Sequence, residues 1–224
     1  ILFSTNLLLF LYFKKRGSKN SILWVIAYVL ISFYFSGNIL WVETFVTFLL
    51  SIYLYFGLFR KSWVSFVLGV LLSQVVLMRP TILPALFFLV LATKIDLSLI
   101  IGGVVGMTFP LFYLFYHHLW GDFWQVAIIF NRTVYPYQAK IVPTLRQVLL
   151  TTAVLLPSLA ICVRKKEFLL ALSLILMLFL AYPRFGFEHL QPLILVSIIA
   201  FSSLPKTKIV PTVYILFFLL LNLA

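Results

Sequence analysis

The chain of 224 residues alternates long apolar runs with short gaps, and its basic residues are concentrated in every second gap. Lys and Arg collect on the cytoplasmic side of membrane proteins. The alternation therefore predicts a multi-pass membrane protein whose five basic gaps face the cytoplasm. Those gaps hold twelve of the seventeen basic residues, namely Lys14, Lys15, Arg16, Lys19, Arg60, Lys61, Lys94, Arg164, Lys165, Lys166, Lys206 and Lys208.

Composition supports a membrane location. The chain is 64% hydrophobic and only 10% charged, which is not typical of a water-soluble domain. The net charge of +12 is carried mostly by short loops beside apolar runs, so anionic lipid headgroups explain it better than nucleic acid, and no nucleic-acid partner is expected. Cys162 is the single cysteine, which excludes an internal disulfide and a cysteine metal cluster.

The apolar runs predict an all-α fold, a transmembrane helix bundle of about ten apolar segments that forms one domain over residues 1–224. Continuous apolar runs argue against a lipid-facing barrel, which needs alternation. Because Ile1 already lies inside a run, we expect an N-terminally truncated fragment that lacks the first helices. The runs are Ile1–Phe13, Ser21–Ser36, Ile39–Leu58, Trp63–Met78, Thr81–Thr93, Leu97–Tyr116, Val148–Val163, Leu169–Tyr182, Gln191–Leu204 and Ile209–Ala224.

Most of these runs are short for a full crossing, which takes about 20 residues. Only Ile39–Leu58 and Leu97–Tyr116 reach that length alone. Gly102 and Gly106 in the second of them have the small-xxx-small spacing that lets another helix approach closely. Two pairs of shorter runs could each be a broken hairpin that enters and leaves by one face, namely Trp63–Met78 with Thr81–Thr93, and Leu169–Tyr182 with Gln191–Leu204.

One long connection, residues 117–147, contains polar residues, and the topology places it outside the cytoplasm. Within it, Phe123–Phe130 is apolar enough to lie in the interface as a short helix, with Asp122 as its cap. His118 and Asp122 are spaced so that they could share a metal, but no metal site is predicted here.

Ionisable and polar residues from three separated segments are expected at similar height on the non-cytoplasmic face. Such residues in a membrane helix cost a few kcal/mol, so they are usually functional or paired. Together they predict a polar cavity that opens away from the cytoplasm. The set comprises Glu43, then Gln74 and Arg79, then Arg184, Glu188 and His189; the other cations on that face are Arg132, Lys140 and Arg146.

Each of these candidates also has a structural interpretation. Arg79 could extend to lipid headgroups instead of binding an anionic group such as phosphate. Arg184 and Glu188 are four residues apart and could form a local ion pair. His189 could cap or pack instead of transferring protons, and Glu43 could bond a neighbouring helix as a protonated acid.

Several nucleotide-binding motifs are absent from the sequence. Asp96 and Asp122 are its only aspartates, so it has no Asp-x-Asp metal motif for nucleotide sugars. It also lacks a Walker loop and a dinucleotide glycine motif.

Four stretches, spread over roughly residues 21–204, together resemble integral-membrane glycosyltransferases of the GT-C class. They are Gly37-Asn38-Ile39-Leu40-Trp41-Val42-Glu43, the segment from Gly69 to Thr81 that ends in Met78-Arg79-Pro80-Thr81, Phe130-Asn131 with Tyr135, and the segment from Pro183 through His189-Leu190-Gln191-Pro192. The last two are similar to the bacterial branch related to protein mannosyltransferases and aminoarabinose transferases.

This resemblance implies an enzyme of the cell membrane that moves a sugar from a polyprenyl-phosphate donor to an acceptor on the non-cytoplasmic face. It implies that Arg79 and Arg184 bind the donor phosphate, and that Glu188, His189 and the 117–147 connection shape the acceptor side. The family's catalytic acid lies upstream of this chain, so the catalytic residue is unknown, Glu43 is not assigned that role, and the chain alone is expected to be inactive. A divalent metal is left open for the full-length enzyme.

Two other functions are compatible with the pattern. A transporter or lipid-carrier flippase would also have short broken helices and intramembrane charge, and a membrane scaffold would leave the outer cations dispensable. A transporter is expected to hold its polar residues near the bilayer midplane. Because the candidates gather at one outer edge, the sequence favours the enzyme.

Overall fold

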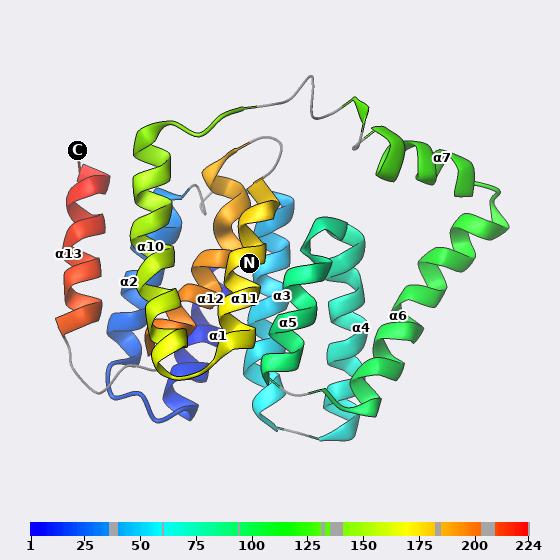
Figure 1. Cartoon of the computed structure of the whole chain (residues 1–224). Helices are drawn as coiled ribbons and strands as arrows, with labels where there is room; N and C mark the ends of the chain where they lie inside the picture. Colours follow the sequence, from blue (N-terminus) through cyan, green and yellow to red (C-terminus); the bar gives the residue numbers. More distant parts are fainter. Residues whose placement is uncertain are drawn as a thin grey trace.

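The computed structural model describes residues 1–35, 40–59, 61–93, 95–130, 133–134, 141–181, 185–202 and 209–223. Within these ranges the chain forms eleven α-helices joined by short turns (Figure 1). The predicted all-α class is therefore confirmed.

Each predicted apolar run corresponds to a helix, and the boundaries differ by a few residues. The α-helices are α1 (Leu2–Lys15), α2 (Ser21–Tyr34), α3 (Val42–Phe56), α4 (Ser62–Met78), α5 (Leu83–Thr93), α6 (Leu97–Tyr116), α7 (Trp120–Trp124), α10 (Leu145–Arg164), α11 (Phe168–Met177), α12 (Gln191–Ser202) and α13 (Ile209–Leu223). Short 3-10 turns are η1 (Gly57–Phe59), η2 (Pro80–Ile82), η4 (Leu178–Ala181) and η5 (Phe187–Leu190), and η3 (Gln125–Phe130) is a π-helix.

Side-chain caps determine where some of the helices begin. Helix α10 starts three residues before the predicted run because Thr144 and Gln147 form a capping box, in which each side chain accepts the other's backbone N–H, at 3.3 and 2.8 Å. The predicted interfacial helix also starts early, since α7 follows Leu119. Asp122 then lies inside its first turn, so the prediction that Asp122 caps this helix is wrong.

Among the described residues, three helices are long and apolar enough to cross a membrane, namely Val42–Phe59, Leu97–Tyr116 and Leu145–Arg164. A fourth is counted if α4 and the segment Pro80–Thr93, which meet at 117°, are taken as one broken span. The break falls at Arg79-Pro80, because proline disfavours a helical residue before it. The predicted bend is thus confirmed for this pair; in the second pair, residues 182–184 lie outside the described ranges.

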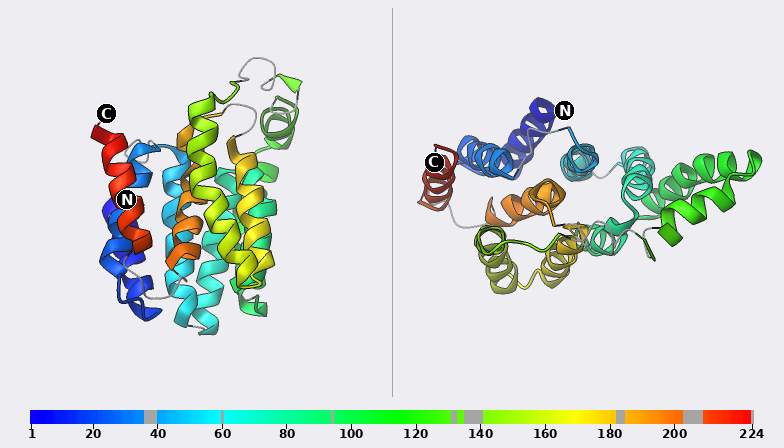
Figure 2. Two further views of the ribbon diagram at one scale, coloured as in Figure 1. Left: turned by 60° about the vertical axis from the view of Figure 1, so that its left-hand side comes forward. Right: turned by 90° about the horizontal axis from the view of Figure 1, so that it is seen from above.

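Most helices run between the two ends of the bundle (Figure 1 and Figure 2), and helices far apart in the sequence pack together, for example α4 with α6, α5 with α11 and α2 with α13. The ends that follow α1, α3, α5, α10 and α12 gather at one end of the bundle, the lower end in Figure 1, which we call the basic end. The basic gaps therefore lie at the same end of the bundle, as their alternation predicted. That this end faces the cytoplasm stays a prediction. Its described basic residues are Lys14, Lys15, Arg16, Lys19, Lys61, Arg164, Lys165 and Lys166.

Helix α12 forms the centre of the bundle. Every residue from Gln191 to Phe201 is buried, and α2, α3, α10 and α11 pack against it (Figure 2). A helix that is apolar around its whole circumference is stable only when neighbours surround it. The position of α12 therefore fixes how the segment just before it, η5, enters the bundle.

Helix α6 contacts the bundle through α4, and glycines make that contact close (Figure 2). A Cβ on Gly102 would overlap the Phe66 carbonyl group of α4, and one on Gly106 would overlap the Ser73 side chain. The sequence predicted both glycines correctly as a packing site. It missed Gly69 of α4, whose Cβ would overlap the Leu99 carbonyl oxygen.

We predict that Gly102→Ala lowers the free energy of unfolding by about 1–3 kcal/mol, because the added methyl group meets backbone atoms that cannot rotate away. Gly103→Ala is the matched control, since the nearest atom to its Cβ is the Gly69 oxygen at 3.9 Å. Unfolding of the purified protein in detergent, followed by tryptophan fluorescence, measures both. Equal stability of the two variants would contradict the close packing of α4 and α6.

The sidedness is testable with single cysteines, because Cys162 is buried and can be replaced by alanine. A cysteine at Lys19 should react with a membrane-impermeant maleimide only after cells are permeabilised, and one at Val142 should react in intact cells. Both side chains are exposed in the structure. Labelling of the Lys19 position in intact cells would reverse the predicted topology.

Candidate functional site

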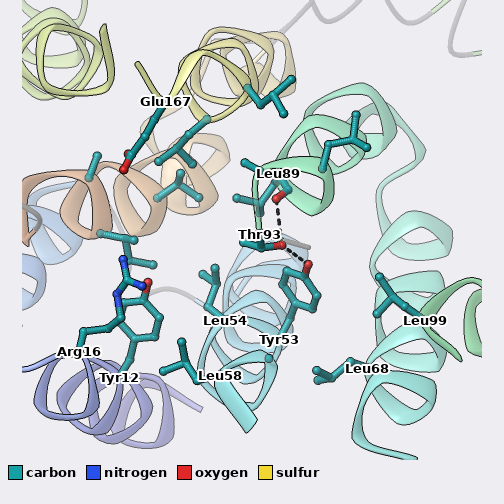
Figure 3. Close-up of a pocket in the computed structure, with 18 of the residues that line it drawn as sticks. Tyr12, Arg16, Tyr53, Leu54, Leu58, Leu68, Leu89, Thr93, Leu99 and Glu167 are labelled. Atoms are coloured by element: carbon teal, nitrogen blue, oxygen red, sulfur yellow. Dashed lines mark hydrogen bonds between the residues drawn. The ribbon is translucent and has the colours of Figure 1, made fainter. Parts of the chain in front are cut away.

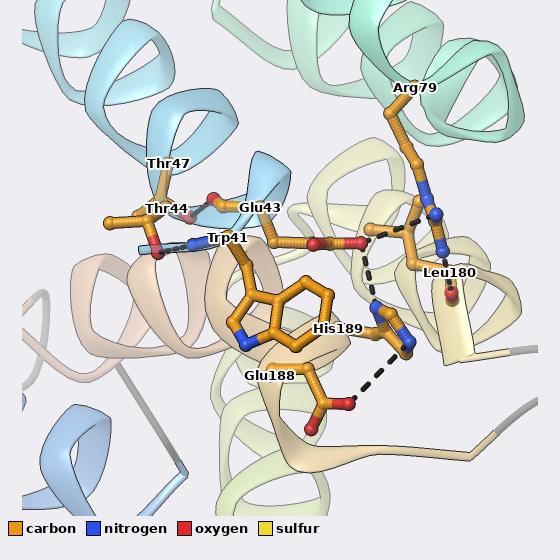
Figure 4. A network of polar contacts seen from close by, with 8 residues as sticks. All are labelled: Trp41, Glu43, Thr44, Thr47, Arg79, Leu180, Glu188 and His189. Carbon is orange, nitrogen blue, oxygen red and sulfur yellow. Dashed lines mark hydrogen bonds and ion pairs between the residues drawn. The ribbon is translucent and has the colours of Figure 1, made fainter. Parts of the chain in front are cut away.

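The structure brings four of the five candidate site residues together at the end of the bundle opposite the basic end. Glu43 lies in the first turn of α3, Arg79 at the break between α4 and η2, and Glu188 and His189 in η5 (Figure 4). Three segments that are far apart in the sequence thus meet at one point. The fifth candidate, Arg184, lies outside the described residues.

The carboxylate of Glu43 is the centre of this cluster. Its side chain is 2% exposed, and its Oε1 atom lies 2.7 Å from His189 Nδ1 and 3.4 Å from Arg79 Nη1. A buried carboxylate is stable as an anion only when cations and donors surround it. These contacts match an ionised, paired Glu43 and not the protonated acid that was the alternative.

Arg79 faces into the bundle. Its Nη2 atom donates to the Leu180 carbonyl oxygen at 2.7 Å, and its Nε atom is buried without a hydrogen-bond partner among the described residues. The side chain is 28% exposed, and its described polar contacts are with Glu43 and Leu180. The sequence did not predict the contact with the Leu180 carbonyl, which lies in the turn η4 after α11. Every residue has a backbone carbonyl, so the residue type does not indicate which one accepts a hydrogen bond.

His189 has one anchored nitrogen and one available nitrogen. When Nδ1 donates to Glu43, Nε2 carries the lone pair, and it lies 3.8 Å from Glu188 Oε1, beyond hydrogen-bond distance. An imidazole held in this way is suited to accept a proton at Nε2, while the carboxylate stabilises the resulting cation.

Two further contacts hold η5 in place. Gln191, at the start of α12, accepts from the Ser32 hydroxyl at 2.7 Å and donates to the backbone carbonyls of Ser32 and Phe35 at the end of α2. The Phe185 N–H donates to the Ile141 carbonyl at 3.1 Å, which ties η5 to the connection before α10. Gln191 could have been recognised from the sequence, because it is a polar residue at the start of a buried helix. It was not singled out among the site candidates.

Other polar residues of this face have structural partners. Gln74 donates to the Gly106 carbonyl at 3.2 Å, so it belongs to the α4–α6 interface and not to the predicted polar set. Arg146 donates to the Tyr34 hydroxyl at 2.6 Å and lies over its ring. Within the described ranges, no three His, Cys, Asp or Glu side chains are arranged to hold a metal ion, and this includes His118 and Asp122.

The polar cavity predicted around these candidates stays a prediction, because residues 36–39 and 182–184 beside them lie outside the described ranges. The large cavity in the described part of the chain, about 730 Å³, lies at the basic end (Figure 3), and none of the four described candidates lines it. Instead, Glu43, Arg79 and His189 contact one another directly.

Comparison of the chain with protein-family models, with curated proteins and with solved structures finds no match. Its chemistry therefore has to be argued from the residues that the fold assembles. The buried cluster of Glu43, Arg79 and His189 is the arrangement from which that argument starts.

Removal of the central charge tests the cluster. We predict that Glu43→Gln lowers the free energy of unfolding by about 1–3 kcal/mol, less than for a fully buried pair because Arg79 keeps some water. Glu188→Gln, at a carboxylate that is 23% exposed and 3.8 Å from its partner, should change it by less than about 0.5 kcal/mol. Denaturant titration in detergent compares the two.

A double-mutant cycle provides the control. In an Arg79→Gln background, Glu43→Gln should cost about 1 kcal/mol less than in the wild type, because the ion pair is already gone. Equal costs in both backgrounds would show that Glu43 and Arg79 are not coupled.

Proposed function

We propose that this chain is part of a membrane-embedded glycosyltransferase of GT-C type, a multi-pass bundle of about ten apolar segments. It moves a sugar from a polyprenyl-phosphate donor to an acceptor on the non-cytoplasmic face of the cell membrane. The observation that carries the proposal is the buried cluster of Glu43, Arg79 and His189 at the end opposite the basic turns. The similarity of residues 37–43, 69–81 and 183–192 to that class supports it.

The proposed reaction makes two demands on the protein. The bond between the sugar C1 and the phosphate oxygen breaks, so negative charge develops on the departing polyprenyl phosphate. A new bond forms between C1 and the acceptor oxygen, and the acceptor hydroxyl loses its proton. A cation near the phosphate and a base near the acceptor satisfy these demands.

In this proposal His189 accepts the proton at Nε2. Glu43 holds the opposite ring nitrogen at 2.7 Å, fixes the ring orientation and stabilises the imidazolium that forms. Glu43 acts through His189 and is a positioning residue. Glu188, 3.8 Å from Nε2, lies on the side from which the acceptor would approach.

In the same proposal, Arg79 and Arg184 bind the donor phosphate. The described cluster contains two carboxylates, Glu43 and Glu188, and one guanidinium, Arg79, so a phosphate needs a second cation. Arg184, four residues before Glu188, supplies that charge in the sequence. Guanidinium groups suit the task because their N–H donors match phosphate oxygens in pairs.

A transporter or lipid-carrier flippase is the second candidate, and one observation favours it. The bundle is hollow at the basic end, while the Glu43 cluster packs tightly at the other end. A protein closed at one end and open at the other has the shape of one state in an alternating-access cycle. Such a protein would move the lipid-linked substrate across the bilayer without breaking its phosphate bond.

Reconstitution of the full-length native protein with a radiolabelled polyprenyl-phosphate sugar and a membrane extract as acceptor source tests the enzyme. His189→Asn should lower transfer by roughly 10²–10⁴-fold, because the base is lost. Arg79→Gln should lower it as well, by weakening phosphate binding. Arg146→Gln is the matched control, since this cation at the same end is bonded to Tyr34.

Wild-type transfer in both His189→Asn and Arg79→Gln would refute the enzyme proposal. Movement of the intact donor across the bilayer, with no release of polyprenyl phosphate, would favour the flippase instead.

A further inference from the structure

The cavity at the basic end has the size and position of a ligand site. Its volume of about 730 Å³ falls within the range of roughly 300–1,000 Å³ that is usual for small-molecule sites. Seven α-helices and the turn between α10 and α11 contribute to its wall, so it lies among the helix ends and not on an outer face. It is separate from the Glu43 cluster.

The cavity has a charged rim with both signs. Arg16 at the end of α1, and Lys166 and Glu167 in the turn after α10, are exposed and line it (Figure 3). No ion pair joins Arg16 to Glu167 in the structure, although both line the same space. Among the described residues neither group has an ion-pair partner, and both face the cavity.

The fourth charged group of the wall, Asp96, is already engaged. Its carboxylate accepts from the Leu99 N–H at 2.9 Å and from the Ser65 hydroxyl at 2.7 Å. It caps α6 and joins that helix to α4. It is a structural carboxylate, which leaves Glu167 as the acidic group of the rim.

Below the rim the wall combines apolar side chains with polar ones such as Ser65 and Thr93. Leucines from five helices and η1 surround the space, together with the rings of Tyr12 and Tyr53. The leucines that line it are Leu54, Leu58, Leu68, Leu89, Leu91, Leu99, Leu169 and Leu170. A site with two cations and an acid at its mouth, and with both leucines and polar side chains in its wall, is complementary to an amphiphile.

Lys166 on the rim has an unusual backbone conformation for a lysine. Lys166 has φ of 60°, in the left-handed region where glycine is favoured at a helix end. The following N–H, of Glu167, donates to the Cys162 carbonyl at 2.8 Å and closes the helix. A lysine in this position costs stability relative to glycine.

We propose that this cavity binds one zwitterionic phospholipid from the leaflet at the basic end, with its phosphate on Arg16 and Lys166 and its ammonium on Glu167. The headgroup and the first part of the acyl chains occupy the cavity, and the chains continue between the helices. An ammonium that still carries N–H donors is favoured over a quaternary one, because it can hydrogen-bond to the carboxylate.

Native mass spectrometry of the full chain in nanodiscs tests this proposal. The probes are phosphatidylethanolamine, phosphatidylcholine and phosphatidylglycerol in equal amounts, followed by mild removal of lipid in detergent. The wild type should retain one phosphatidylethanolamine. Arg16→Gln should reduce its retention roughly tenfold, and Arg164→Gln, exposed in the same region but outside the cavity wall, should not.

Two further variants distinguish lipid binding from an effect on folding and from a general effect of positive charge. Lys166→Gly should raise the Tm of the delipidated protein, because it relieves the left-handed backbone, and still lower lipid retention. Glu167→Gln should remove the preference for phosphatidylethanolamine over phosphatidylglycerol while keeping the phosphate contact.

Equal retention of the three lipids by the wild type, or unchanged retention in Arg16→Gln and Lys166→Gly, would overturn the proposal. Displacement of the bound lipid by millimolar inorganic phosphate would also overturn it, since the apolar wall would then contribute nothing. These results do not depend on transfer activity at the opposite end.

Discussion

The fold depends most on the contacts of Glu43. Inside the apolar bundle this carboxylate forms an ion pair and a hydrogen bond. A carboxylate that is 2% exposed among hydrocarbon side chains is costly unless its partners are always present. Arg79 and His189 are those partners, and they come from the break between α4 and η2 and from the turn before α12. One electrostatic requirement therefore holds three distant segments in register.

Other contacts also position the segments that carry Arg79 and His189. The break at Arg79-Pro80 follows from the proline, and α12 is held by apolar contacts on all sides and by Gln191 at its start. The two ends of the bundle differ. Glu43, Arg79 and His189 contact one another at one end, whereas Arg16 and Glu167 line a cavity at the basic end.

Residue type and spacing predicted most of the local structure, and the failures have specific causes. The glycine pair Gly102 and Gly106 was identified because close helix packing needs small residues at that spacing. The same spacing of Ser65, Gly69 and Ser73 on the partner helix was overlooked, because two of its three members are serines. Asp122 was taken as a helix cap from its residue type, while the fold begins α7 earlier, after Leu119. Gln74 was assigned to the polar set because it lies about one turn from Arg79. Position along a helix does not specify which face a side chain occupies, and Gln74 points toward α6.

The sequence by itself determined the helical class, the helix order and the sharing of one end by the basic turns, because hydrophobic period, proline and charge act over a few neighbouring residues. Only the tertiary structure decided that Glu43 pairs with Arg79 and His189, that the Leu180 carbonyl completes the arginine's contacts, and that the cavity lies at the basic end. Those outcomes depend on how helices rotate and pack against each other, and short-range patterns carry no information on the distances between segments far apart in the chain.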